Sequence, residues 1–561
     1  DNPQRSHTQL FPRRGLAAQD GKLEDEKITA MKRHFSEEDF TKIIAESVEL
    51  DEIQKNDDSK AAIATIPRLS LDEVNPKIVP NTINLKVQEG ILVGYTEVVS
   101  SFEMMYVDFG LDLSNVEVND IFLLPIVLRL MMKSGTKQYL PEQIDLEIGK
   151  ASSGINPEFM IENVKPRGNQ GGNQYTVFSG IHLATKVFFR GRCMAVKLPD
   201  YLNLLAEIIF QGRVFEHDMV VTTLREMNEE FMVRLTDESH ILTQSRLEAR
   251  YSIQGMIEES LHGIHAFKKL QDTMDDAAED YTGLIARLES VRSKIIEGHR
   301  NGMILSVTGE AHLIRLTRKY FDGFIKDQVP RNNKGKPFKQ PGKYPHPWVP
   351  QLKTEQPTIF PIVDEGIIIP STVNYVGKGG RVFEVNEAVS GSASVVAKFI
   401  EDGYLFKKLE VERGAVKAYA NLNFRHGTLS FVSFRDPSLA STLQIYNSAK
   451  GYLSRTILNR EKLPDAAHYA VLATIAKLDG DAPQPDEIGW EFLKEFVRDD
   501  NSDYRQRWRD EIINTKRSDF VDFINKFLAL ERPSVVVLGS REKFDQTMNT
   551  TKVRLQLLGL D

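Results

Sequence analysis

Two neighbouring stretches of alternating residues decide the fold class of the first folded region. They are Ile91-Leu92-Val93-Gly94-Tyr95-Thr96-Glu97-Val98-Val99 and Met104-Met105-Tyr106-Val107-Asp108-Phe109-Gly110-Leu111-Asp112-Leu113. Both show the period of two that is typical of β-strands. An apolar segment through Met132, ended by Ser134-Gly135-Thr136, has the character of a buried helix. Strands and helices in one region predict a mixed fold.

The same order of elements occurs twice along the chain. Residues 66–330 begin with these strands, continue through helices and end in a strand over 303–309 and a helix over 310–325. Residues 358–561 repeat this order, with strands expected over 366–370, 371–376, 409–422 and 429–434, then helices, then a closing strand over 534–539. The predicted fold class is therefore α+β, with two homologous α/β units that each place helices on one face of an antiparallel-rich sheet.

Two segments outside these units lack the pattern of a self-sufficient domain. Residues 23–49 predict a charged helix, with a start signal where Ser36 precedes Glu37, Glu38 and Asp39. Residues 331–350 hold five Pro, five Lys or Arg and no acid, a composition that resists packing. We expect residues 331–357 to be a solvated linker. We expect residues 1–65 to be an interior piece of a longer protein.

Composition and charge exclude several classes of protein. Of the 561 residues, 41% are hydrophobic and 27% charged, as in ordinary globular proteins. The formal net charge of −8 argues against a dedicated nucleic-acid binder. The single Cys193 cannot form an internal disulfide, so nothing requires an oxidising compartment. The longest apolar run, 121–132, is interrupted by Pro125 and Arg129 and is shorter than the ~18–20 residues that span a bilayer.

The residues that could hold a metal do not form a zinc-hydrolase motif. Neither His-Glu-x-x-His nor its inversion, His-x-x-Glu-His, occurs. The nearest pattern is His262-Gly263-Ile264-His265, which Glu258 and Glu259 precede. Two His three apart on one helix could share a metal, but the sequence suggests no third ligand. We interpret these residues as a packed or solvated helix face.

Other reactive residues have equally plain interpretations. Cys193 has no neighbouring base in the sequence and is interpreted as a buried thiol. The spacing of Gly377-Lys378-Gly379-Gly380 fits neither a P-loop nor a dinucleotide fingerprint. Asn549-Thr550-Thr551 is a glycosylation sequon, which has meaning only in a secreted protein. The residues alone therefore indicate a two-domain protein with no complete active site.

A resemblance extends this interpretation. Thr372-Val373-Asn374-Tyr375-Val376-Gly377-Lys378-Gly379-Gly380, followed by Phe431-Val432-Ser433-Phe434-Arg435-Asp436-Pro437, resembles the last domain of the presequence proteases. These are zinc oligopeptidases of the pitrilysin–insulysin family, whose presequence-protease branch includes falcilysin. Further matching segments occur in the right order, and they include 67–71, 112–114, 134–136, 154–155 and 189–194. The resemblance covers roughly residues 66–561 and is specific as a set.

The resemblance implies an architecture and a partner. Members of the family have four homologous α/β-roll domains in two halves, which a helical hairpin joins and which close like a clamshell around an unfolded peptide. The zinc and the His-x-x-Glu-His helix belong to the N-terminal half. This chain would be the C-terminal half: residues 1–65 the remnant of the hairpin, 66–330 the third domain, 331–357 a linker and 358–561 the fourth domain. No cofactor is then expected in this chain, zinc is expected in the N-terminal half, and an organellar matrix (mitochondrion or plastid) is the implied location.

The family's C-terminal half contributes an Arg and a Tyr to the active site, in the pattern Arg-x-x-Gly-Gly-Ala-Tyr. An Arg and a Tyr there can bind the substrate backbone and stabilise the oxyanion opposite the zinc. An ungapped register places Glu410 where the Arg belongs and Val416 where the Tyr belongs, with Gly414-Ala415 in support. A register slipped by three residues places Arg413 and Tyr419 there instead.

The two registers make different predictions. A slip by an odd number reverses the face of a strand, so both pairs cannot point into the chamber. In the slipped register, we expect the polar ends of Arg413 and Tyr419 to be exposed and free of internal partners. In the ungapped register, which we prefer, oxyanion stabilisation from this half is lost.

Two classes of function follow. In the first, the chain is the substrate-enclosing half of an active zinc peptidase that needs the zinc-bearing N-terminal half and acts on unfolded peptides. In the second, it is a non-catalytic homologue that serves as a structural or peptide-binding subunit. A companion polypeptide with His-x-x-Glu-His would favour the first class.

Overall fold

A computed structural model describes residues 6, 16–55, 59, 61–62, 65–67, 69–80, 82–165, 175–297, 300–331, 337–458, 463–480, 483–528 and 531–560. The chain divides into two compact units, Asp1–Arg68 and Leu69–Asp561.

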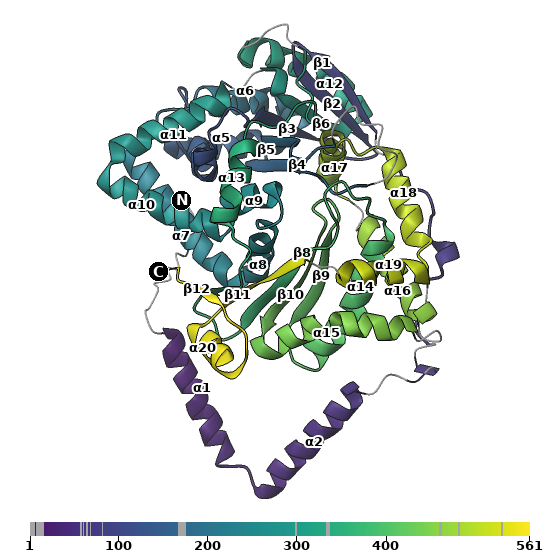
Figure 1. Cartoon of the computed structure of the whole chain (residues 1–561). Coiled ribbons are helices and arrows are strands. Elements are labelled where there is room, and N and C mark those ends of the chain that lie inside the picture. The colour runs from purple at the N-terminus through teal and green to yellow at the C-terminus, as the bar shows by residue number, and fades with distance from the viewer. Residues whose placement is uncertain are drawn as a thin grey trace. The chain divides into compact units, whose positions relative to one another are not determined.

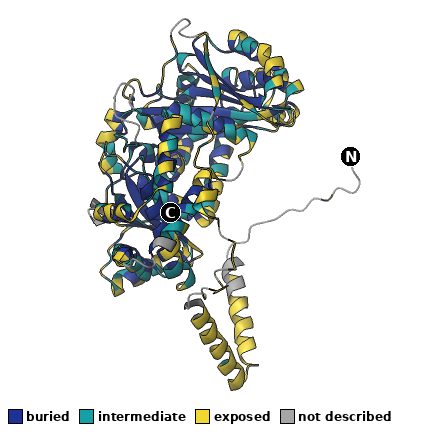
Figure 2. Cartoon of the chain, turned by 90° about the vertical axis from the view of Figure 1, so that its right-hand side faces the viewer, coloured by how far each residue is buried: buried dark blue, intermediate teal, exposed yellow. Residues whose placement is uncertain are grey.

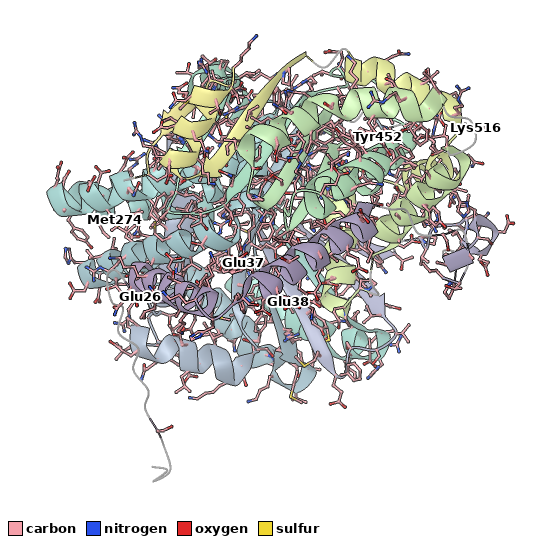
Figure 3. All side chains as sticks on the ribbon, turned by 90° about the horizontal axis from the view of Figure 1, so that it is seen from below. Glu26, Glu37, Glu38, Met274, Tyr452 and Lys516 are labelled. Carbon is pink, nitrogen blue, oxygen red and sulfur yellow. The ribbon has the colours of Figure 1, made fainter. Side chains whose placement is uncertain are left out.

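The described part of the first unit includes the helices α1 (Leu16–Lys32) and α2 (Glu37–Lys55). The single helix predicted over 23–49 is wrong, because the chain turns between Arg33 and Ser36. The predicted start signal is confirmed: the backbone N–H of Asp39 donates to Ser36 Oγ at 3.2 Å, and the Ser36 N–H donates to Asp39 Oδ2 at 2.8 Å. Nearly every residue of these helices whose side chain is described is exposed (Figure 2), and Figure 3 shows Glu37 and Glu38 at the start of α2.

The second unit contains two six-stranded sheets with helices around them (Figure 1). The strands are β1 (Ile83–Gln88), β2 (Ile91–Val98), β3 (Met104–Asp112), β4 (Ile155–Asn163), β5 (Leu183–Met194), β6 (Ile304–Glu310), β7 (Glu365–Ile368), β8 (Asn374–Arg381), β9 (Lys417–Asn423), β10 (Thr428–Asp436), β11 (Glu531–Gly539) and β12 (Gln556–Leu558). The helices are α4 (Leu124–Lys133), α5 (Pro141–Ala151), α6 (Leu198–Phe210), α7 (His217–Asp237), α8 (Ser239–Glu248), α9 (Ile253–His262), α10 (Ile264–Glu279), α11 (Tyr281–Ile296), α12 (Ala311–Gly323), α13 (Val349–Ile359), α14 (Ser392–Ile400), α15 (Leu439–Leu458), α16 (Leu463–Asp479), α17 (Pro485–Arg498), α18 (Ser502–Ile513), α19 (Arg517–Leu528) and α20 (Arg541–Thr550).

The two sheets share a strand order. The first is β1-β2-β6-β3-β5-β4 and the second is β12-β7-β11-β8-β10-β9. Strand β6 runs parallel to β2 and antiparallel to β3, and β11 is likewise parallel to β7 and antiparallel to β8. The remaining pairs of the shared core, β3–β5, β4–β5, β10–β8 and β10–β9, are all antiparallel. The predicted α+β class, with two units of one architecture, is confirmed.

Helices of each half of the sequence pack on one face of that half's own sheet, as predicted, and a helix from the other half covers the opposite face. Helices α4, α6 and α12 pack with the first sheet in one apolar core, and α14, α15 and α19 pack with the second in another. The opposite face of the first sheet is covered by α17, and that of the second sheet by α8 (Figure 1). Each covering helix comes from the other half of the sequence, which explains why residues 69–561 form one compact unit.

The expected solvated linker is wrong for the segment that leads into α13. Trp348 is only 2% exposed, and its indole N–H donates to the backbone oxygen of Val116 at 2.7 Å. His346 is buried, and its Nε2 lies 2.8 Å from Thr185 Oγ1. A buried indole needs such a partner for its N–H. Residues 332–336 lie outside the described part of the chain.

Candidate functional site

The segment that carries both candidate registers is helical before it is a strand. Residues Glu401–Val411 form a π-helical segment, η6, and β9 begins only at Lys417. The strand predicted over 409–422 is therefore wrong at its start. Gly414 makes the turn between them at φ +76°, a conformation that favours glycine. Because Glu410 lies on a helix, the argument from alternating strand faces does not apply to it.

Glu410 closes the free edge of the second sheet. Among the described strands, β9 pairs only with β10, so half of its N–H groups face away from the sheet. The Ala418 N–H donates to Glu410 Oε1 at 2.9 Å, and the Ala420 N–H donates to Glu401 Oε2 at 3.0 Å. An unpaired strand edge is a template for another strand, and these two carboxylates occupy it.

The side chain of Tyr419 points from β9 towards α8. Its hydroxyl donates to Gln244 Oε1 at 3.1 Å, and its ring lies edge-on to His240 with centroids 6.5 Å apart. Burial, and to a lesser extent the charge of Glu401, raises the pKa of Tyr419 well above its usual value. The expectation that this hydroxyl has no internal partner is not met.

Arg413 and Val416 are both exposed. Arg413 lies in the turn after η6, and its guanidinium has no hydrogen bond or ion pair with the described residues. The Val416 N–H donates to the backbone oxygen of Phe434 at 3.1 Å, and its side chain is 59% exposed. By strand alternation Val416 shares a face with Ala418 and not with Tyr419. The side chains of Arg413 and Tyr419 therefore do not contact each other, nor do those of Glu410 and Val416. The catalytic roles of both pairs stay predictions.

The glycine motif serves the packing of α8. Gly377, Lys378, Gly379 and Gly380 all lie within β8, not in a loop. A Cβ on Gly377 would lie 2.4 Å from Thr243 Cγ2 on α8, which is too close for van der Waals contact. This glycine lets the covering helix approach the strand.

The second motif forms the end of β10 and the start of α15. Arg435 has φ +49° at an irregularity where β10 leaves its register with β8. The buried carboxylate of Asp436 accepts hydrogen bonds from Ser433 Oγ at 2.7 Å, Thr442 Oγ1 at 2.6 Å and the Ser438 N–H at 2.8 Å. These three bonds fix the chain between strand and helix, so Asp436 has a structural role.

His262 and His265 do not share a helix face. His262 ends α9 and His265 belongs to α10, with Gly263 between the helices. Their rings pack edge-on or tilted against different partners, Phe159 at 5.4 Å and Phe360 at 5.4 Å. Burial, followed by the positive charge of Arg246, lowers the pKa of His265 to about 4. The two histidines thus lie on consecutive helices rather than on one, and each packs against an aromatic ring, in keeping with the interpretation of packed helix residues.

The nearby acid and the cysteine are also structural. Glu259 is fully buried and accepts from Ser245 Oγ at 2.7 Å. Cys193 lies on β5 and is 1% exposed, and burial raises the pKa of its thiol to about 12. The prediction of a buried thiol is confirmed.

Within the described residues, no three His, Cys, Asp or Glu side chains are grouped as metal ligands would be. No helix in the described part of the chain is long and apolar enough to cross a membrane.

Two family models match the chain. One, described as a region associated with the C subfamily of M16 peptidases, matches residues 10–272, and the other, described as PreP C-terminal domain, matches residues 364–540. Together these two matches support a protein similar to the C-terminal half of the M16 presequence proteases. The resemblance first seen in the motifs of β8 and β10 is confirmed.

Curated relatives align with nearly the whole chain. It is 24% identical to presequence protease 1, chloroplastic/mitochondrial, of Arabidopsis thaliana, over 98% of this chain and 47% of that protein. It is 22% identical to protein HypA of Clostridium perfringens, over 97% and 52%. It is 19% identical to the mitochondrial presequence protease of Xenopus laevis, over 93% and 49%. The chain thus spans about half the length of the curated relatives it matches.

A solved structure has a similar fold. The peptidase M16 inactive domain from Pseudomonas fluorescens aligns with a TM-score of 0.51 at 13% sequence identity, over 85% of this chain and 100% of that one. At this identity the likeness concerns the fold alone.

Proposed function

We propose that this chain is the substrate-enclosing C-terminal half of a clamshell zinc oligopeptidase that degrades unfolded peptides. The observation that carries the proposal is the match of the PreP C-terminal domain model to residues 364–540, which include β9 and Tyr419. Residues 1–65 would be the remnant of the connecting hairpin, 66–330 and 358–561 the third and fourth domains of the family, and 331–357 their linker.

The described residues of this chain do not fit a catalytic zinc. Such a zinc needs about three protein ligands and an open position. The described residues offer no group of three ligands, and His262 and His265 pack against separate aromatic rings. The zinc and the water-activating base are therefore expected in the N-terminal half, and we assign no step through a metal to this chain.

The contribution of this half would be to hold the peptide. Because Glu401 and Glu410 occupy the free edge of β9, a substrate strand would not add there. Contact would come instead from the face that carries Tyr419, with Arg413 at the preceding turn. For Tyr419 to stabilise an oxyanion, its hydroxyl would have to exchange Gln244 for the substrate.

A second candidate function is a peptide-binding or structural subunit without catalysis. The observation in its favour is that Glu410 and Tyr419 both have internal partners. A half in which these groups already stabilise the fold would enclose a peptide without adding to oxyanion stabilisation.

The test is reconstitution. The purified chain is assayed for bound zinc and for hydrolysis of an unstructured peptide, first alone and then mixed with a companion polypeptide that carries His-x-x-Glu-His. We expect no stoichiometric zinc and no cleavage from the chain alone, and cleavage from the mixture. One tightly held zinc per chain with chelator-sensitive hydrolysis would contradict the proposal. A stable mixture that binds the peptide without cleaving it would favour the second candidate.

We also propose a reducing organellar matrix, mitochondrial or plastid, as the location. Relatives named as mitochondrial or chloroplastic support it. Fractionation of the source cells, with the chain followed by antibody, tests this location.

A further inference from the structure

A cavity of about 660 Å³ lies between the start of α16, the turn from α18 to α19 and the segment Leu71–Glu73. Its volume falls in the ~300–1,000 Å³ range of ligand pockets. None of its described lining residues belongs to β9, η6 or α8, so it is separate from the site proposed above. Figure 3 labels Lys516, in the turn that borders the cavity.

The floor of this cavity is apolar. Phe520, Leu463 and Val471 are buried, with exposed fractions of 0%, 4% and 3%. Three partly buried apolar residues pack against the same core and complete the floor: Leu71, Ala467 and Ile513. Such a floor offers an alkyl chain van der Waals contact and no hydrogen bond.

The rim of the cavity is positively charged. Lys516 lines it from the turn before α19 and Arg517 from the first residue of that helix, and both are exposed. The Lys516 ammonium makes no hydrogen bond or ion pair with any described residue. Arg517 Nε donates to the backbone oxygen of Ile457 at 3.1 Å, which leaves the two terminal nitrogens for another acceptor. Among the described residues that line the cavity there is no Asp or Glu.

Other polar groups beside the cavity already have partners. The Thr515 hydroxyl donates to the backbone oxygen of Ile512 at 2.8 Å. The carboxylate of Asp519, next to the rim, accepts from the Lys516 backbone N–H at 2.7 Å. The cationic side chains at the rim are therefore the groups that remain to bind a charged ligand.

An apolar floor below a cationic rim calls for two features in one ligand. A small inorganic anion would reach Lys516 and Arg517 but would leave the floor exposed to water. A neutral hydrocarbon would cover the floor but would leave the cations unpaired. A carboxylate at the end of an alkyl chain meets both needs, because a guanidinium binds a carboxylate through two parallel N–H groups and the chain is removed from water.

We infer that this cavity binds a free long-chain fatty acid. The carboxylate would lie between Lys516 and Arg517, and the alkyl chain would lie on the floor formed by Leu463, Val471 and Phe520. The inference goes beyond the proposed function and does not rest on it.

The experiment uses the full chain and isothermal titration calorimetry with three monomeric amphiphiles. Tetradecanoate is the expected ligand. Decanoate has the same head group and a shorter chain, and tetradecyltrimethylammonium has the same chain length and a cationic head. Co-sedimentation with phosphatidylglycerol vesicles tests whether a membrane surface, instead of the free acid, supplies the anionic group.

We expect one molecule of tetradecanoate to bind per chain and no binding to the vesicles. Decanoate should bind at least about tenfold more weakly, because each fully buried CH₂ group contributes about fourfold in affinity. The cationic amphiphile should also bind at least about tenfold more weakly, because it meets charges of its own sign at the rim. Equal affinity of either compound with tetradecanoate would overturn the inference, and so would binding to vesicles without binding of the free acid.

Variants locate the binding. Lys516→Glu should lower the affinity for tetradecanoate by about tenfold or more, because an attraction becomes a repulsion, while an acid before the first turn suits α19. Ala467→Phe should lower it as well, since the larger side chain occupies the floor. Lys516 is exposed, so its variant tests the site even if Ala467→Phe does not fold.

A matched control is Lys353→Glu on α13, which reverses the charge of an exposed lysine outside the cavity and should leave the affinity unchanged. Unchanged affinity in Lys516→Glu, or an equal loss in the control, would overturn the inference. These measurements use the chain without a partner half, so their failure is distinct from a failure of the proposed function.

Discussion

The two sheets of the second unit have the same core topology and different covers. Helix α17 covers the first sheet with Trp490, Leu493 and Val497, which pack with Leu92 and Phe188 in an apolar cluster. Helix α8 covers the second sheet beside a set of buried charges. Glu365 on β7 accepts from Arg246 at 3.0 Å and from Arg250 at 2.9 Å. Two sheets with the same strand order are thus covered by helices in different surroundings, one apolar and the other beside buried charges.

In each cover a glycine lets the helix approach the strand closely, but the glycine lies on the helix in the first cover and on the strand in the second. Gly489 lies on the helix α17, where a Cβ would come within 1.8 Å of Thr308 Oγ1 on β6. Gly377 lies on the strand β8, where a Cβ would come within 2.4 Å of Thr243 on α8. Helix and strand therefore approach each other closely in both covers, but the element that provides the glycine differs. The sixth strands also differ, since β1 is antiparallel to β2 and β12 is parallel to β7.

The largest expected effect is on the apolar cover. Trp490 is 4% exposed and its ring lies edge-on to Phe188 at 5.0 Å. Trp490→Ala should lower the free energy of unfolding by about 3–5 kcal/mol, because it removes the largest side chain of the cluster and leaves a cavity. Urea unfolding measures the loss. Val521→Ala, at a 40% exposed position, is the control and should change stability little. Equal losses would show that α17 is not a buried cover.

The charged cover should respond to pH as well as to substitution. Glu365→Gln should lower the free energy of unfolding by about 3 kcal/mol at pH 7, because it leaves two buried guanidinium groups without their carboxylate. Burial alone would raise the pKa of Glu365, but hydrogen bonds and charges from Arg246 and Arg250 outweigh it and lower the pKa below its usual value.

The lowered pKa of Glu365 determines how the stability that this carboxylate contributes changes with pH. A carboxylate with a lowered folded pKa stabilises the protein above its unfolded pKa of about 4.3, and this stabilisation is lost as pH falls through the folded value. The difference between the parent chain and Glu365→Gln should therefore narrow below about pH 4. Urea unfolding at several pH values tests it, and a difference that widens in acid would contradict the assignment. Trp490→Ala should show no such narrowing.

The two glycines should each resist a single methyl group. Gly489→Ala and Gly377→Ala should each lower the free energy of unfolding by about 1–3 kcal/mol through overpacking. Thr308→Ala should restore part of the first loss and Thr243→Ser part of the second, since each removes the atom that the new Cβ meets. Gly323→Ala on α12 has open space and should be neutral or stabilising by about 0.4–1 kcal/mol. Thermal unfolding of these variants measures this, and losses that the second substitutions leave untouched would refute a direct clash.

The smallest expected change in stability is at Tyr419, which contacts α8, the helix that covers the second sheet. Tyr419→Phe should cost about 0.5–1.5 kcal/mol of stability, because it removes the hydrogen bond to Gln244 on α8. In a reconstituted two-half enzyme, we expect turnover to change little, since the hydroxyl is already engaged. A loss on the order of 10²–10³-fold in turnover with little change in stability would instead assign an oxyanion role to Tyr419 and favour the slipped register. Gln244→Ala is the matched control for the hydrogen bond.

Local patterns predicted much of the fold and little of the site. The alternation over 91–99 and 104–113 correctly predicted β2 and β3, and the strand predicted over 534–539 is the end of β11. The strand predicted from residue 409 onwards is wrong at its start, because residues 401–411 form η6. The acids Glu401 and Glu410 have their role only because β9 is an edge strand, and a sequence does not show which strand lies at an edge.

The sequence by itself determined the period of the elements, their repeated order and the family to which the motifs belong, because these depend on residues close together in the chain. Only the tertiary structure decided what covers each sheet. The pairs Gly489 with Thr308 and Gly377 with Thr243 are more than 130 residues apart, and their meaning is a short distance between a helix and a strand from different halves of the sequence. From the sequence alone, each of these glycines could be interpreted only as a conformationally flexible residue. In the folded chain, the missing side chain of each glycine lets a helix and a strand pack closely, and only tertiary folding brings the two elements together.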